Sequence, residues 1–294
     1  MGDEPGEMQK KVAEIEVETG KRGLFFGQDS LQILANDKFK ELQENHVFVL
    51  PQAGHRFKDE TEMDVLGTRL DATGSHETAC RHRLEEANKV WHRFKRTLCS
   101  PNLTKQFKLY HCNKIVGASA LHNAGGWTPT AKVCRMLDIK ENTWHRQVLR
   151  RKRKADEDWV THQRRATHEA RKYRKKWNVE RLAEQAWKLH HKWMGHIWRQ
   201  ISEPEQHDSI AAVALEWRNA RWWRTTQALG TAAERRPQGM ARPGRGRPRK
   251  DAEETLEELA GTDWRQRAQD REDWKADEEA FVQACRRKFR QSGT

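Results

Sequence analysis

From residue 76 onward, apolar residues recur along the chain at the spacing of one face of an α-helix. The clearest stripe lies between residues 80 and 98, and it consists of Cys80, Leu84, Ala87, Trp91, Phe94 and Leu98. Stripes of this kind are buried when helices pack on one another. We therefore expect a mainly α-helical chain, with a small α/β region confined to the residues before this change of period.

The first two predicted helices, residues 77–99 and 103–122, are separated only by the short turn Ser100–Asn102. We expect them to pair antiparallel, with Trp91 and Phe94 facing the second helix. Residues 156–177 predict a polar helix of alternating charge, whose N-terminus carries the acidic run Asp156–Asp158. Three further apolar stripes are Leu103, Phe107, Tyr110, Lys114, Ala118 and Leu121; Val133, Leu137, Trp144 and Val148; and Val179, Leu182, Ala186, Leu189, Trp193 and Ile197.

The first 75 residues predict one short helix and three short strands. The helix carries Val12 and Ile15 and ends near Gly20. The strands are expected at 31–34, 47–50 and 65–70. The whole chain then divides into an α/β segment at 1–75, helical segments at 76–150 and 151–234, a linker at 235–250 and C-terminal helices at 251–294.

Aliphatic and Phe residues are scarce in this chain. Leu, Ile, Val and Phe together number 49 of 294 residues, below the ~20% under which disorder becomes common. The 13 Trp residues offset this deficit, because each buries a large area and replaces several aliphatic side chains. We expect folded helices around thin cores.

The charge balance favours an anionic partner. Lys and Arg number 56 against 43 Asp and Glu, a net charge of +13, which is typical of chains that bind nucleic acid. We predict contacts to RNA and/or DNA from three clusters of basic residues. They are Arg150, Arg151, Lys152, Arg153 and Lys154; Arg218, Arg221 and Arg224; and Arg245, Arg247, Arg249 and Lys250. The Trp217, Trp222 and Trp223 rings beside the second cluster either stack on exposed bases or belong to the core under the Arg stems.

The third cluster lies in Pro243–Lys250, a run in which Arg alternates with Gly and Pro. Its Pro residues lack the backbone N–H and its Gly residues add freedom, so neither helix nor sheet forms there. Arg245 and Arg247 around Gly246 resemble an AT-hook, a narrow cationic ribbon that suits the minor groove of A·T-rich DNA. The alternative is a flexible linker between two helical regions.

The residues predict no catalytic site, metal site or cofactor. His190, His191 and His196 have no Cys or acid at ligand spacing. The five Cys form no CxxC pair and predict neither a zinc site nor a disulfide framework, which fits a reducing compartment. The chain has no apolar leader and no run of ~18 apolar residues, so we expect an intracellular protein, in the nucleus or cytoplasm, that does not span a membrane.

Between Arg81 and Thr128 a series of short motifs follows in a fixed order: His82-Arg83-Leu84, Ala87, Trp91, Phe94, Leu98-Cys99, Leu103, Lys105, Leu109, Leu121-His122-Asn123 and Trp127-Thr128. This order resembles the region after the polymerase palm in LINE-type non-LTR retrotransposon reverse transcriptases. Val65-Leu66-Gly67 resembles the end of the palm. Asp158-Trp159, Lys192–Ile197, Gly244–Lys250, Trp264, Ala268–Arg271 and Trp274 resemble the C-terminal part of such elements.

This resemblance implies a partial palm at 1–75, thumb-like helices at 76–150 and a basic C-terminal region. The family activity is RNA-directed DNA polymerisation, but its catalytic carboxylate turn would precede residue 1. Ser30 and Leu31 stand where the family has Lys and Thr, and His122 replaces a Tyr. We therefore expect a truncated, catalytically inactive fragment that retains RNA or DNA binding. Two alternatives stay open: a helical DNA-binding or chromatin-associated protein that uses the AT-hook-like ribbon, and a helical scaffold without a nucleic-acid partner.

Overall fold

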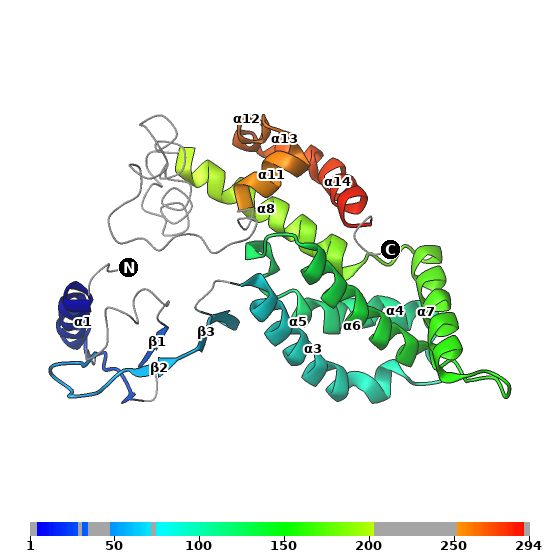
Figure 1. Ribbon diagram of the computed structural model, residues 1–294, viewed down its shortest axis with the longest axis horizontal. Helices are drawn as coiled ribbons and strands as arrows, with labels where there is room; N and C mark the ends of the chain where they lie inside the picture. The colour runs from blue at the N-terminus through cyan, green and yellow to red at the C-terminus, as the bar shows by residue number, and fades with distance from the viewer. Residues whose placement is uncertain (1–4, 29–30, 35–47, 72–74, 203–251, 291–294) are drawn as a thin grey trace, which may run out of the picture. The chain divides into compact units, whose positions relative to one another are not determined.

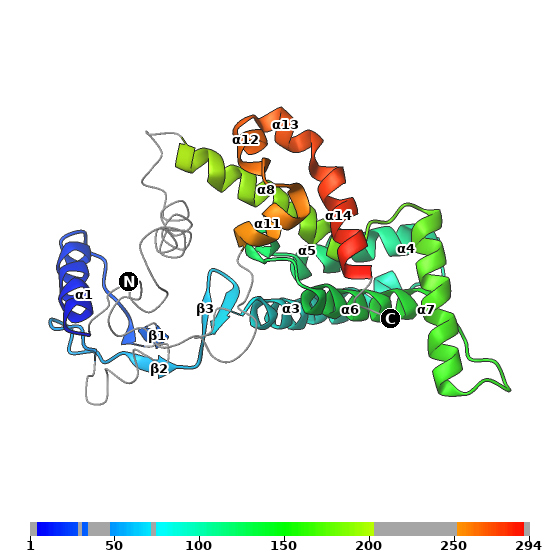
Figure 2. The same ribbon diagram turned by 45° about the horizontal axis from the view of Figure 1, so that its top comes forward.

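The computed structural model describes residues 5–28, 31–34, 48–71, 75–202 and 252–290 (Figure 1). The described residues fall into two compact units, one up to Ala79 and the other from Cys80 onward. The first holds one helix and four short strands, and the second is built from helices (Figure 2). The prediction of a mainly α-helical chain with a small α/β region at the N-terminus is confirmed.

In the N-terminal unit, one helix is tied to a loop by side-chain hydrogen bonds. The helix is α1 (Pro5–Gly20). Its Gln9 side chain donates Nε2 to the carbonyl of Val49 at 2.6 Å and accepts the Val49 N–H at 3.0 Å. The buried Glu16 carboxylate accepts the N–H groups of Gln52 and Ala53. These polar contacts hold α1 in a unit with few apolar residues.

The strands of this unit form two small sheets. β1 (Gln32–Leu34) pairs parallel with β2 (Lys58–Glu60), and β3 (Glu62–Val65) pairs antiparallel with β4 (Thr68–Asp71). The single strand predicted at 65–70 is wrong, because Leu66 and Gly67 both have positive φ, 49° and 76°, and make the turn of a hairpin. In the described part of the strand predicted at 47–50, only Val49 makes a β-bridge.

The helical unit contains the elements that carry the predicted apolar stripes. They are α3 (His76–Leu98), α4 (Lys105–Cys112), the π-helical turn η2 (Asn113–Gly117), α5 (Ala118–Ala120), η3 (Ala124–Gly126), α6 (Ala131–Leu149), α7 (Trp159–Lys176), α8 (Leu182–Ser202), α11 (Ala252–Ala260), α12 (Trp264–Gln269), α13 (Arg271–Ala276) and α14 (Glu278–Arg290). α6 packs against α4, α7 and α8, and α8 packs against α12, α13 and α14 (Figure 1).

The predicted pairing of the first two helices is represented by one side-chain contact between the start of α3 and the end of the following helical segment. The Arg83 guanidinium near the start of α3 donates to the carbonyl of Ser119, which lies at the end of the α4–η2–α5 segment. Trp91 is buried, as predicted. The prediction that Phe94 faces the partner helix is wrong, because its side chain lies at the edge of the stripe, in a stretch of α3 (residues 92–97) where every residue is exposed.

The face predicted to be buried on the second helix is also wrong. Phe107 and Tyr110 are exposed, and the helix turns Leu109, Cys112 and Val116 toward the core instead. The same buried face carries the polar side chains of Lys108 and Asn113. Because two polar residues occupy core positions and two aromatic residues occupy surface positions, apolar periodicity points to the wrong side of this helix.

Trp side chains supply much of the core between α8 and the C-terminal helices. The Trp274 ring stacks on His191 with centroids 3.9 Å apart, and its Nε1 donates to the His191 carbonyl at 2.8 Å. Trp264 contacts both Trp274 and Trp198. This arrangement fits the expected substitution of Trp for aliphatic residues. Leu189 and Trp193, predicted as part of the α8 stripe, are 38% and 40% exposed, so their assignment to the core is wrong.

Candidate nucleic-acid interface

Helix α7 buries one narrow face, which half-buried positions border, and exposes the opposite face. Asp158 caps its N-terminus by accepting the N–H groups of Val160 and Thr161 at 2.8 and 3.0 Å, as its place at a helix start predicts. The buried positions recur every four residues, and they are His162, Ala166, Ala170 and Arg174. Small alanine side chains let α7 lie close against α6, with which it packs.

The end of this buried face is fixed by an ion pair inside the core. Arg174 Nη1 donates to Glu141 Oε2 at 2.8 Å, and the Glu141 side chain is fully buried. Glu141 Oε1 also accepts from Asn113 Nδ2 and from the Leu182 N–H. Burial raises the pKa of Glu141 to about 7, while the charge of Arg174 opposes that rise. His145 hydrogen-bonds Asn113 at 2.8 Å, and burial lowers its pKa to about 3, so it is neutral. The network joins four elements and sets the position of α7.

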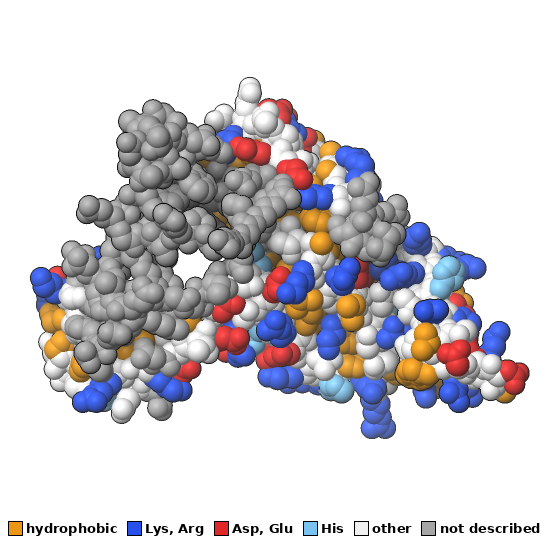
Figure 3. Space-filling model, viewed as in Figure 1, with side chains coloured by type: hydrophobic (Ala, Val, Ile, Leu, Met, Phe, Trp, Pro, Cys, Tyr) orange, Lys and Arg blue, Asp and Glu red, His pale blue; other side chains and the backbone are white. Residues whose placement is uncertain are grey.

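The opposite face of α7 is a cationic stripe. Its exposed side chains are Arg164, His168, Arg171, Lys172, Lys175 and Lys176. Within the described residues, none of its Lys and Arg side chains is paired with an acid, and the only Glu of the helix, Glu169, is engaged by Arg151 and Arg165. Blue side chains are visible along the right-hand side of Figure 3, where α7 lies in Figure 1. We call this set of six residues the α7 face.

The predicted basic run of residues 150–154 lies in the loop between α6 and α7. Arg150 ends α6 with a left-handed backbone (φ 46°), and its guanidinium reaches the Cys99 carbonyl. Arg151 is held inside the unit by Glu169 at 2.5 Å and by the Tyr173 hydroxyl at 2.8 Å. Lys152, Arg153 and Lys154, like Arg150, are exposed and have no ion pair to described residues. The run therefore supplies four cations to the surface, three of them in the loop before α7.

An internal clamp fixes the path of this loop. Arg165 of α7 donates to both carboxylate oxygens of Glu157, at 2.8 and 2.7 Å, and to the Lys152 carbonyl at 3.0 Å. The hydrogen bond from Arg165 lowers the pKa of Glu157 to about 2, so this carboxylate stays ionised and paired at neutral pH. The clamp neutralises Glu157, one of three acids at positions 156–158, and Lys152 and Lys154 remain exposed.

The remaining predicted contacts lie at positions that the structure does not describe. They are Arg218, Arg221, Arg224, Arg245, Arg247, Arg249 and Lys250, all between residues 203 and 251. Their assignment to nucleic-acid binding stays a prediction.

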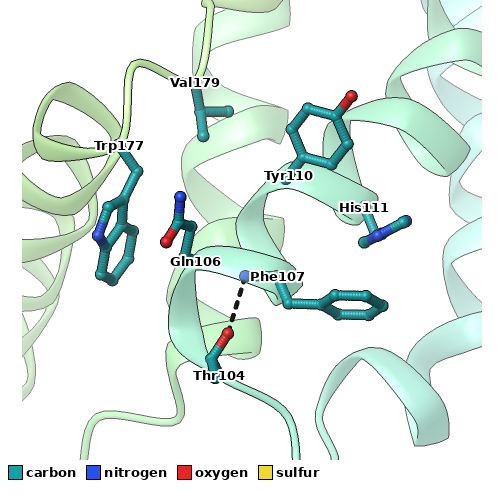
Figure 4. A pocket seen from close by; sticks show the side chains of 7 residues that line it. All are labelled: Thr104, Gln106, Phe107, Tyr110, His111, Trp177 and Val179. Carbon is teal, nitrogen blue, oxygen red and sulfur yellow. Dashed lines mark hydrogen bonds between the residues drawn. The ribbon is translucent and has the colours of Figure 1, made fainter.

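Beyond the C-terminal end of α7, an aromatic hollow opens toward α4. Its volume is about 330 Å³, and Thr104, Gln106, Phe107, Tyr110, His111, Trp177 and Val179 line it. Trp177 and Val179 lie on one side, while Tyr110, His111 and Phe107 come from α4 on the other (Figure 4). Periodicity missed this site, because it assigned Phe107 and Tyr110 to the core.

The described His, Cys, Asp and Glu side chains outside this interface belong to the core or the surface and form no metal site. Among the described residues, no group of three or more His, Cys, Asp or Glu side chains is arranged to hold a metal ion. His190 hydrogen-bonds the Gly125 carbonyl, and His191 stacks on Trp274. Burial lowers the pKa of His191 to about 3. Both rings are therefore part of the core of α8. Within the described part of the chain, no helix is long and apolar enough to cross a membrane.

Comparison with protein-family models, with curated proteins and with solved structures gives no significant match. A function for the chain must therefore be argued from its own charges, aromatic rings and buried contacts.

Proposed function

We propose that the chain binds RNA or DNA through the α7 face and the exposed loop residues Lys152–Lys154. The observation that carries this proposal is the accumulation of unpaired cations along α7, against a buried side of small residues and one ion pair. The resemblance to the C-terminal part of LINE-type reverse transcriptases, a family that works on RNA and DNA, supports the same class of partner.

The geometry suits a phosphate backbone. A helix of 18 residues is about 27 Å long. Arg164 and Arg171 lie seven residues apart, about two helical turns, and Lys172, Lys175 and Lys176 follow them on the same side. Such side chains neutralise phosphates without reading the sequence. We therefore expect binding that depends on salt and depends little on base order.

The test is a pair of matched triple variants, measured by fluorescence anisotropy on single-stranded RNA, single-stranded DNA, duplex DNA and RNA–DNA hybrid over a range of salt. Changing Arg164, Arg171 and Lys175 to Ala should weaken binding to every probe roughly tenfold or more. It should also flatten the plot of log affinity against log salt by about two to three units. The thermal midpoint should not change, because the three side chains are exposed.

The control removes the same charge elsewhere in the helical unit. Arg81, Arg271 and Arg287 are exposed and outside the α7 face, and changing them to Ala should alter affinity by less than about threefold. If the two triple variants lose affinity equally, binding depends on net charge alone and the α7 face is not the interface.

The main alternative is a chromatin-type protein that reads A·T-rich DNA through Pro243–Lys250. It predicts tighter binding to A·T tracts than to G·C duplex, and it predicts that changing Arg245 and Arg247 to Ala abolishes this preference. Equal affinity for the two duplexes would leave the α7 face as the reason for binding. Genomic sequence upstream of Met1 that encodes a palm with paired Asp residues would favour the retroelement origin.

A further inference from the structure

We propose that the aromatic hollow between α4 and Trp177 binds one unpaired base of a single-stranded RNA or DNA, an inference that rests on the nucleic-acid binding proposed for α7. The volume of about 330 Å³ falls in the range of small-ligand pockets. The hollow starts where α7 ends, so a strand that follows the α7 face can reach it.

The first argument is the exposure of two aromatic rings. Phe107 is 44% exposed and Tyr110 is 50% exposed, although both lie on a helix that buries Lys108 and Asn113. The rings are three residues apart and therefore on one side of α4. His111 lies beside both, with ring centroids 3.9 Å from Phe107 and 5.4 Å from Tyr110. Exposed π-faces at this density are the platform on which unpaired bases stack.

The second argument is that the opposite wall is already fixed. Trp177 lines the hollow and stacks on Tyr173, with centroids 4.9 Å and planes 14° apart. Tyr173 is in turn held by the Arg151 guanidinium through its hydroxyl. A ring fixed before binding loses little freedom when a ligand arrives, which favours affinity.

The third argument is charge. Two ammonium groups lie over rings at the hollow or next to it: Lys114 Nζ is 5.6 Å from the centroid of Tyr110, and Lys105 Nζ is 5.2 Å from that of Tyr173, the ring that stacks on Trp177. None of the seven lining residues is acidic. The lining also offers the Gln106 amide and the Thr104 hydroxyl, whose oxygen accepts the Phe107 N–H and whose own O–H remains a donor (Figure 4). An apolar slot with cations at its rim and a few polar groups fits a base joined to a phosphate.

The experiment compares a blunt duplex with the same duplex carrying a ten-nucleotide single-stranded overhang, of thymidine in one arm and uridine in the other. Changing Tyr110 to Leu keeps an apolar side chain but removes the π-face. It should reduce the extra affinity of the overhang by roughly 5- to 150-fold. Affinity for the blunt duplex and the salt dependence should be unchanged. Tyr110→Trp should retain the extra affinity.

The matched control is Phe94→Leu, because Phe94 is an exposed aromatic residue of α3 outside the hollow, and it should have no effect. Photocrosslinking of the wild-type chain to an overhang with one 4-thiouridine should map to α4 or to Trp177, and this result does not depend on the folding of any variant. An unaffected overhang affinity in Tyr110→Leu, or crosslinks confined to other peptides, would overturn the base-binding inference.

If the α7 triple variant weakens binding while Tyr110→Leu does not, only this inference fails. If the α7 triple variant has no selective effect, the proposed function fails.

Discussion

Helices α7 and α8 follow each other in the chain and have similar lengths, but they are held in the fold in different ways. α8 is buried over a broad face that combines aliphatic, aromatic and neutral His side chains, among them Leu182, Trp187, His191 and Met194. α7 buries two Ala residues, one His and one Arg whose charge is paired with Glu141. The stability of α8 is therefore distributed over many contacts, whereas the attachment of α7 depends on few.

This difference shows how one unit can supply both a core and an exposed cationic surface. A broad apolar face would have left α7 little room for five exposed Lys and Arg side chains on one side. A narrow face of small residues, fixed at one end by a buried ion pair, leaves most of the helix circumference exposed. The cost is that α7 depends on a polar network in which the loss of one member leaves another buried without its partner.

The largest effect should come from breaking that ion pair. Changing Arg174 to Met leaves the Glu141 carboxylate buried with fewer donors, and it should lower the free energy of unfolding by ~3–5 kcal/mol at pH 8. The loss should be smaller at pH 5, because Glu141, whose pKa is already raised to about 7, is then protonated. Urea melts of the wild type and the variant measure the loss in unfolding free energy at pH 8 and at pH 5. A loss below about 1 kcal/mol at pH 8 would show that α7 is not held by this pair.

The next effect concerns the packing of α8. A β-carbon at Gly195 would overlap Nε1 and Cδ1 of Trp274, so Gly195→Ala should displace the Trp274 ring from His191 and cost about 3 kcal/mol. Thermal melts and limited proteolysis of the C-terminal helices measure the change. Gly126 is the matched control, because a β-carbon there meets no atom within 4 Å and its φ is not positive. Equal stability of the two Ala variants would contradict the described packing of α8.

The smallest of these effects is a pH dependence located on α8. The pKa of His191 is about 3 in the folded chain, against an ordinary value near ~6.5. The unfolded chain therefore binds more protons as the pH falls below about 6.5, and stability is lost in that direction. Between pH 6.5 and 5 this one group should cost about 2 kcal/mol.

His191→Phe isolates that contribution, because an aromatic ring keeps contact with Trp274. The variant should lose less stability than the wild type over this pH range. Glu141 acts with the opposite sign, since its raised pKa stabilises the folded chain as the pH falls from 7 toward 4.5, but it is present in both proteins and cancels in the difference. Parallel pH curves for the two chains would mean that His191 is not held in a neutral form.

Sequence periodicity correctly predicted which side of a helix is buried where that side is apolar. All four residues of the stripe Val133, Leu137, Trp144 and Val148 are buried in α6. It failed where polar residues occupy buried positions and aromatic residues occupy exposed positions. In α8 the buried face includes His190 and His191, so it is wider than an apolar stripe, and Leu189 and Trp193 fall outside it. A hydrophobicity pattern cannot identify a neutral His that packs as an aromatic ring.

The candidate interface was predicted only in part. The basic run marked the loop at Lys152–Lys154 by composition alone. The α7 face was not predicted, because residues 156–177 were interpreted as a helix of alternating charge, whereas α7 holds a single acid, Glu169, among its Lys and Arg residues. The signal that was available is the four-residue spacing of Ala166, Ala170 and Arg174, which marks the buried side and thereby the exposed one. The aromatic hollow could not be predicted, since it joins α4 to residues about 70 positions later through tertiary packing.

The stacking of Trp274 on His191 also affects the order in which the protein assembles during synthesis. The two residues are 83 positions apart, whereas Arg174 and Glu141 are separated by 33 and Arg83 and Ser119 by 36. Helices α3 to α7 can therefore close on one another before the cover of α8 has been translated. Translation proceeds at ~5–20 residues per second, so several seconds pass between the synthesis of α8 and that of helices α12 to α14, which pack against it. A nascent chain at this stage lacks the Trp274 and Phe281 rings that contact His191, and it is the form of the protein that we expect chaperones to bind.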